Sequence, residues 1–69
     1  MNMSINSREV IRSLRLTGWI NVAATGSHWQ FTHPARPGRV TVPHPKLDLP
    51  AGAIRSIEKQ SGVTLRRSS

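Results

Sequence analysis

The chain has 69 residues, of which 36% are hydrophobic, and ten Lys and Arg against three acidic residues give it a net charge of +7. This length fits one small domain with one modest core, which excludes a two-domain cofactor enzyme. Because the chain has no cysteine, disulfide scaffolds and cysteine-containing zinc sites are excluded too. No apolar run approaches the roughly 18 residues of a membrane span, and the first seven residues lack the apolar part of a secretory signal. We therefore expect a cytoplasmic protein with no membrane partner.

The positive charge is carried mainly by arginine, with eight Arg and only two Lys. The planar guanidinium group suits phosphate, to which it can donate two parallel hydrogen bonds. Such a one-sided charge on a small domain is typical of proteins that bind a polyanion or an acidic protein. The alternative is charge that only keeps the protein soluble.

The first predicted element is a helix over residues 7–17. Apolar residues recur at helical spacing at Val10, Ile11 and Leu14. Asn6 or Ser7 can cap the helix, and with Asn6 as the cap Glu9 completes a capping box. Gly18 is expected to end the helix. Three arginines share its exposed face: Arg8, Arg12 and Arg15. This face either meets an anionic partner or is simply solvated.

Three short strands are predicted next, over residues 19–24, 28–33 and 39–42. A Gly-Ser turn separates the first two, and a loop rich in Pro and Gly over residues 34–38 precedes the third. Side-chain alternation assigns one set to the core side of the sheet: Trp29, Phe31, His33, Val40 and Val42. His28 is therefore expected on the polar face of the sheet or at its edge.

The segment from Pro43 to Pro45 cannot continue a central strand, because proline has no N–H donor. A second helix is predicted to begin with Pro50 as its first residue and to end at Gly62. Val63 and Leu65 either fold back on the core or begin an extended tail.

The predicted order is α-β-β-β-α, an α+β fold with two helices on one face of a three-stranded antiparallel sheet. Double-stranded-RNA-binding domains have the same order. We expect a single domain over residues 1–69 with a core of about 6–65, and loose ends over residues 1–5 and 66–69.

Histidine is the only obvious catalytic residue type. The three acidic residues are scattered along the chain, which argues against a carboxylate pair or a two-metal nuclease. His28 and His33 lie five residues apart on one strand and so point to opposite faces, which disfavours a shared metal ion. We therefore expect no metal and no cofactor. A lone histidine can still cleave RNA, by taking the 2′-hydroxyl proton or by protonating the leaving 5′-oxygen.

Each histidine has its own interpretation. His33 precedes a proline at a strand end, which is typical of a packed or solvated turn residue. His44 lies between two prolines, where it is either a rigid structural residue or a phosphate contact. His28 follows the Gly-Ser turn on the polar side of the sheet, which makes it the candidate catalytic group.

Several motifs occur together along nearly the whole chain. They lie in residues 7–11, 18–19, 26–34, 40–45, 48–50, 55–57 and 59–62. In this order they resemble the HicA toxin family, the RNA-cleaving partners in HicA–HicB toxin–antitoxin pairs, over roughly residues 6–63. The resemblance implies a double-stranded-RNA-binding-like fold and an mRNA interferase activity. It also implies that His28, in the Gly-Ser-His motif, is catalytic and that a HicB-type antitoxin covers the site. An acidic antitoxin would suit a chain of charge +7.

The sequence departs from the family pattern at two places. Many relatives carry a second histidine directly after the catalytic one, where this chain has Trp29 on the predicted core face. The segments around Leu47 and Ala51 are often rich in lysine in relatives but are apolar here. This second difference would weaken RNA affinity or shift its register.

The first hypothesis is a metal-independent endoribonuclease with His28 as general acid or base. Phosphates would be positioned and bound by Gly26, Ser27, Arg36, Arg39, His44 and Lys46. Cleavage through a 2′-hydroxyl ideally uses two titrating groups; His44 is the first choice for the second group, and water or Lys46 are the alternatives. The alternative is a non-catalytic RNA-binding module, which needs the arginine faces but not His28. A purely structural interaction protein, the third class, would have no affinity for RNA.

Overall fold

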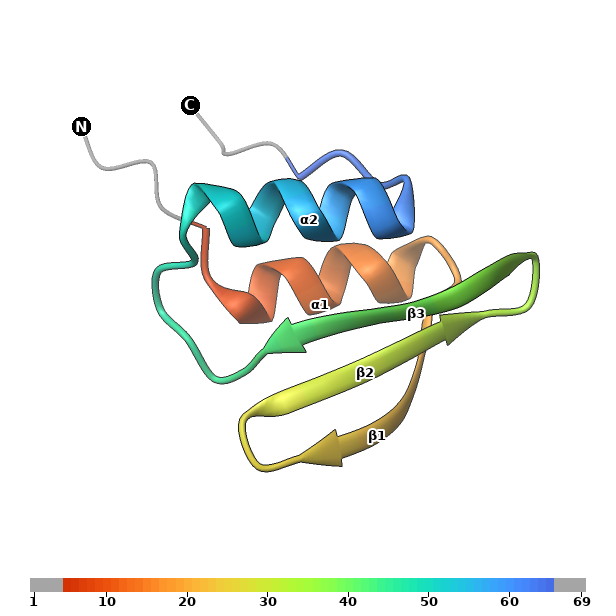
Figure 1. Cartoon of the computed structure of the whole chain (residues 1–69), viewed down its shortest axis with the longest axis horizontal. Helices are drawn as coiled ribbons and strands as arrows, with labels where there is room; N and C mark the ends of the chain where they lie inside the picture. The colour runs from red at the N-terminus through yellow and green to blue at the C-terminus, as the bar shows by residue number, and fades with distance from the viewer. Residues whose placement is uncertain (1–4, 66–69) are drawn as a thin grey trace.

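The chain forms a two-layer α+β fold. The computed structural model describes residues 5–65, with the elements α1 (Ser7–Leu16), β1 (Ile20–Thr25), β2 (His28–His33), β3 (Arg36–Pro43) and α2 (Ala51–Ser61). The strands form one antiparallel sheet in the order β1-β2-β3. Both helices lie on the same side of the sheet and contact β3, while β1 is the strand farthest from them (Figure 1). The predicted α-β-β-β-α order, like that of double-stranded-RNA-binding domains, is confirmed.

The start of α1 follows the sequence signals closely. The side chain of Asn6 accepts a hydrogen bond from the Glu9 N–H at 2.8 Å, and Glu9 Oε1 accepts one from the Asn6 N–H at 3.5 Å. This is the predicted capping box. The helix ends at Leu16, with Thr17 as its C-cap, one residue earlier than predicted. Gly18 then takes a φ of +96°, as expected of the residue that terminates a helix.

The sheet differs from the prediction at both ends of β1 and of β3, and the two strand starts are the informative differences. β1 begins at Ile20, because Trp19 turns into the core and is only 3% exposed. β3 begins at Arg36 and includes Pro37, so the connection from β2 is much shorter than the predicted loop over 34–38. A proline is tolerated there because β3 is an edge strand, whose outward N–H groups have no ladder partner.

Pro50 is not the first residue of α2. Its φ of −60° and ψ of 151° are extended, so it is the N-cap and the helix begins at Ala51, which corrects the prediction. Gly62 ends the helix in the left-handed conformation with a φ of +74°, as predicted. Leu65 folds back on the core, with its N–H donating to Glu58 Oε2 at 2.8 Å.

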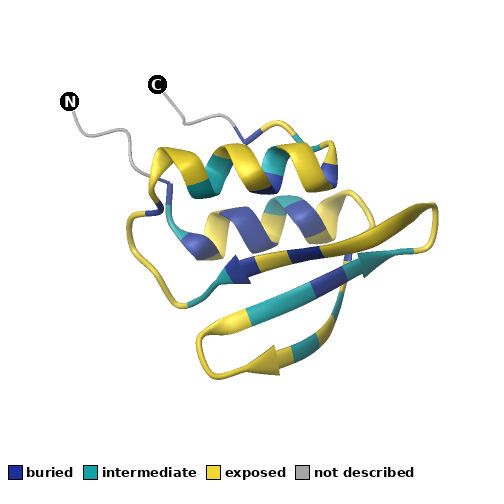
Figure 2. Ribbon diagram, viewed as in Figure 1, coloured by how far each residue is buried: buried dark blue, intermediate teal, exposed yellow. Residues whose placement is uncertain are grey.

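The core lies between the helices and the inner face of the sheet (Figure 2). Its buried apolar side chains are Ile5, Val10, Ile11, Leu14, Trp19, Phe31, Val40, Val42, Leu49, Ile57 and Leu65. Ile5 belongs to this core, although it was expected in a loose end; the other residues expected to be loose lie outside the described range. Within residues 5–65, no helix is long and apolar enough to cross a membrane.

Gly18→Ala should destabilise the fold, because two independent features require glycine there. The φ of +96° disfavours any side chain, and an added Cβ would lie 2.8 Å from Nε2 of His33. We expect a loss in free energy of unfolding greater than about 1 kcal/mol. The matched control is Gly52→Ala in α2, where an added Cβ meets no heavy atom within 4 Å. That change should gain up to about 1 kcal/mol. Urea unfolding measures both, and equal shifts in the two variants would contradict this interpretation.

Candidate functional site

His28 is the first residue of β2 and directly follows the two-residue turn Gly26–Ser27. Its backbone is held from both sides, since it pairs with Thr25 of β1 and with Pro43 of β3. Gly26 takes a φ of +58°, which explains the glycine in this turn. The side chain of His28 is exposed. A fixed backbone with an open side chain is the arrangement that a reacting group needs.

The face of the sheet that the helices leave uncovered carries polar side chains. Phe31 is fully buried on the inner face, so alternation along β2 places His28 and Gln30 on the outer face. Nη1 of Arg39 donates to Oε1 of Gln30 at 2.6 Å, which places the Arg39 guanidinium on that outer face as well. A cation and a histidine therefore share one open surface, as contact with a phosphate backbone requires.

The segment after β3 contacts the Gly26–Ser27 turn through the backbone of His44, whose N–H donates to the Ser27 carbonyl at 2.7 Å. The imidazole of His44 turns the other way. It lies edge-on against Trp29, with ring centroids 4.6 Å apart, and its Nδ1 is 2.6 Å from Oγ of Ser7 in α1. His44 is thus on the helix side of the sheet, whereas alternation places the side chain of His28 on the outer side.

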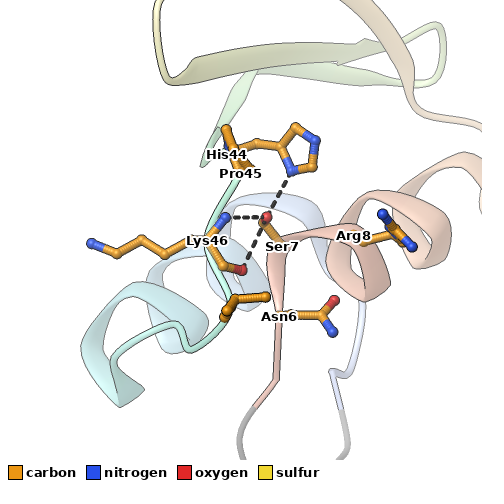
Figure 3. Close-up of a pocket in the computed structure, with 7 residues that line it drawn as sticks. Asn6, Ser7, Arg8, His44, Pro45 and Lys46 are labelled. Atoms are coloured by element: carbon orange, nitrogen blue, oxygen red, sulfur yellow. Dashed lines mark hydrogen bonds between the residues drawn. The ribbon is translucent and has the colours of Figure 1, made fainter.

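Ser7 fixes the segment that carries Lys46. The Ser7 N–H donates to the Lys46 carbonyl at 2.8 Å. The Lys46 N–H donates to Ser7 Oγ at 2.8 Å (Figure 3). Ser7 Oγ also lies 3.2 Å from the Lys46 carbonyl. With 1% of its surface exposed and its hydroxyl engaged in this way, Ser7 is not an accessible nucleophile, despite its contact with a histidine. It anchors the start of α1 to the segment after β3.

Arg36 lies far from His28. It pairs with His33, five residues along β2 from His28, which corresponds to about 16 Å of strand. A Cβ added to Gly62 would lie 2.8 Å from Nη1 of Arg36, so its guanidinium packs against the C-terminal end of α2. A cation is favourable there, next to the last carbonyl groups of a helix. The structure therefore brings together Gly26, Ser27 and His28, with the backbone of His44 bonded to Ser27. It places Arg39 on the same outer face as His28, Lys46 beside Ser7 on the helix side, and Arg36 far from His28.

His33 is a packed turn residue, as its position before a proline indicated. Its Nδ1 accepts from the Ala35 N–H at 2.9 Å, so Nε2 carries the proton and donates to the Thr17 carbonyl at 2.9 Å. The ring also lies edge-on against Trp19 at 5.2 Å. Both nitrogens are used in structural contacts, which leaves neither for a reaction.

No cluster of metal-ligating side chains accompanies this site. Among the residues that the structure describes, no group of three or more His, Cys, Asp or Glu could hold a metal ion.

The comparison with protein families covers most of the chain, including His28 and its turn. Residues 7–63 match the model of the family described as the HicA toxin of bacterial toxin–antitoxin. The chain belongs to the HicA toxin family. It is therefore related to the toxins of toxin–antitoxin systems, and an antitoxin partner is implied. No individual curated protein matches the chain. The matched range includes the Gly-Ser-His turn and extends past Lys46.

Two residues of this HicA-family site stand out beside the predicted set. Trp29, an expected departure from the family pattern, is half-buried and packs against both the core and His44. The sequence predicted for Ser7 only a place at the start of the helix. Its partners, His44 and Lys46, lie 37 and 39 residues later in the chain.

Proposed function

We propose that the protein is a toxin that acts as a metal-independent endoribonuclease on mRNA, with His28 as its catalytic general acid or base. The observation that carries this proposal is the exposed side chain of His28, whose backbone pairs with both neighbouring strands directly after the Gly26–Ser27 turn in a HicA-family chain. Because mRNA is translated in the cytoplasm, we assign the activity to that compartment.

The chemistry needs only side chains and RNA. Neutral His28 takes the proton of a ribose 2′-hydroxyl, and the 2′-oxygen attacks the adjacent phosphorus. The bond from phosphorus to the 5′-oxygen then breaks, leaving a 2′,3′-cyclic phosphate on one product. The other product leaves with a 5′-oxygen that takes up a proton. Arg39, on the same face of the sheet, can stabilise the charge that develops on the phosphate oxygens.

The second proton transfer falls to water more readily than to His44 or Lys46. The His44 ring packs against Trp29 and Ser7 on the helix side of the sheet, away from the outer face that carries His28. The Lys46 backbone is bonded to Ser7 on that same side, whereas water reaches the open outer face. These orientations support a single essential histidine.

An acidic HicB-type antitoxin is the proposed protein partner. The chain carries a net charge of +7, and the arginines of α1 are exposed: Arg8, Arg12 and Arg15. An acidic surface would be attracted over long distance, which speeds association. The antitoxin would inhibit the toxin by covering the corner around His28.

The direct test is RNA cleavage by the purified protein in excess chelator. We expect an mRNA transcript to be cut at the same rate with and without chelator, to yield 2′,3′-cyclic phosphate ends, and a DNA of the same sequence to remain intact. A protein that binds the transcript in a salt-sensitive way but never cuts it would favour the RNA-binding module instead. Cleavage that requires a divalent cation would contradict the proposed mechanism.

A further inference from the structure

A small pocket lies on the helix side of the sheet, away from the outer face that carries His28. A pocket of about 190 Å³ opens between the start of α1 and the segment after β3 (Figure 3). It is lined by Asn6, Ser7, Arg8, His44, Pro45, Lys46 and Leu47. We call it the Ser7 pocket.

The Ser7 pocket gathers basic groups from two separate segments. Arg8 comes from the first turn of α1 and Lys46 from the segment after β3, and both side chains are exposed. The hydrogen bonds between Ser7 and Lys46 hold the two backbones together. None of the described residues that line the pocket is acidic. Its charge is therefore positive and its backbone is fixed before any ligand arrives.

The hydroxyl of Ser7 also determines the state of the His44 ring. A hydroxyl has one proton, and Ser7 Oγ has three partners within hydrogen-bond distance. It accepts from the Lys46 N–H, and when it donates to the Lys46 carbonyl, the remaining contact needs a proton on Nδ1 of His44. All three contacts are satisfied only in that arrangement. Nε2 is then the ring nitrogen that this contact does not use.

Two features favour a nucleic-acid phosphate over a free anion. The pocket adjoins the proposed cleavage site, because the His44 N–H is bonded to the Ser27 carbonyl beside His28. Its rim carries Leu47, whose side chain is 87% exposed and offers apolar surface to a base. Two backbone N–H groups at the start of α1 are already used within the protein, that of Ser7 by the Lys46 carbonyl and that of Glu9 by the Asn6 side chain.

We propose that the Ser7 pocket binds one backbone phosphate of the RNA, other than the phosphate that is cleaved. Arg8 and Lys46 supply the cationic contacts, and Ser7 is a positioning residue that orients His44. The identity of the polyanion as RNA rests on the proposed function. The pocket itself is tested by binding, which does not depend on cleavage.

Binding is measured in the His28→Ala background, so that the RNA stays intact. Arg8→Gln and Lys46→Gln should each weaken binding of a labelled single-stranded RNA about tenfold at low salt. If both residues hold one phosphate, the double variant should lose less than the product of the two single effects. The double variant should also lower the slope of log affinity against log salt by about 0.7, the value for one phosphate contact.

Arg12→Gln is the matched control, since Arg12 is an exposed arginine one turn further along α1 and does not line the pocket. The affinity of the Arg12→Gln variant for RNA should fall less than that of the pocket variants. Its slope of log affinity against log salt should equal that of the His28→Ala protein. Equal effects of Arg8→Gln, Lys46→Gln and Arg12→Gln would overturn the proposal, because general charge would then explain them.

Ser7 is tested by a readout that simple loss of stability does not produce. Nitrogen NMR shifts of neutral His44 should report the proton on Nδ1 in the wild type. In Ser7→Ala the proton should move toward Nε2, and Ser7→Thr, which keeps the hydroxyl, should restore it. A wild-type spectrum with the proton on Nε2 would overturn the positioning role. Weaker RNA binding by the pocket variants, in a protein that never cleaves RNA, would support the pocket and reject the proposed nuclease.

Discussion

His28→Ala is expected to lower the single-turnover rate of RNA cleavage by a factor of about 10² to 10⁴. The side chain is exposed and lies outside the core, so its removal takes away the proton acceptor without disturbing packing. The backbone at position 28 stays paired with Thr25 and Pro43, which keeps the Gly26–Ser27 turn in place. Circular dichroism and urea unfolding should therefore be unchanged while cleavage is lost.

The matched control for this result is His33→Gln, at the other end of the same strand. His33 has both ring nitrogens in hydrogen bonds with the backbone, so replacing it should lower the free energy of unfolding. On protein that remains folded, the cleavage rate should stay within a few fold of wild type. A folded His28→Ala protein that cuts RNA at the wild-type rate would remove His28 from the mechanism.

The element order was readable from the sequence because local signals agree with one another. β2 has the predicted limits, since a Gly-Ser turn precedes His28 and Pro34 follows His33. The start of β3 was not readable in this way. Pro37 and Gly38 favour a loop by composition, and only the position of β3 at the sheet edge makes them acceptable in a strand.

The candidate site was only partly readable. The turn and the polar face predicted where His28 lies, and both depend on residues close in sequence. The contact between Ser7 and His44 joins the start of α1 to the segment after β3, and no local pattern encodes such a pairing. The separation of His28 from His44 likewise depends on the strand register. His28 pairs with Pro43, so His44, the residue after Pro43, points to the helix side of the sheet.

Phe31→Ala is expected to unfold much of the protein. Phe31 lies on the central strand with no exposed surface, and its truncation leaves a cavity beneath the helices that typically costs about 3–5 kcal/mol. A chain of this length has a total stability of about 3–10 kcal/mol, so this loss consumes much or all of it. Val22→Ala is the control, because Val22 is 48% exposed on β1 and should cost under about 1 kcal/mol.

The two variants are compared by urea unfolding, where Phe31→Ala should lower the midpoint far more than Val22→Ala. Equal midpoints would mean that Phe31 does not anchor the core. A ligand that binds only the folded state should restore part of the loss, in proportion to the logarithm of its concentration over its dissociation constant. Because His28 and the Ser7 pocket both depend on β2 and its neighbours for their geometry, RNA binding and cleavage should fall together with the folded fraction in Phe31→Ala. In His28→Ala only cleavage should fall.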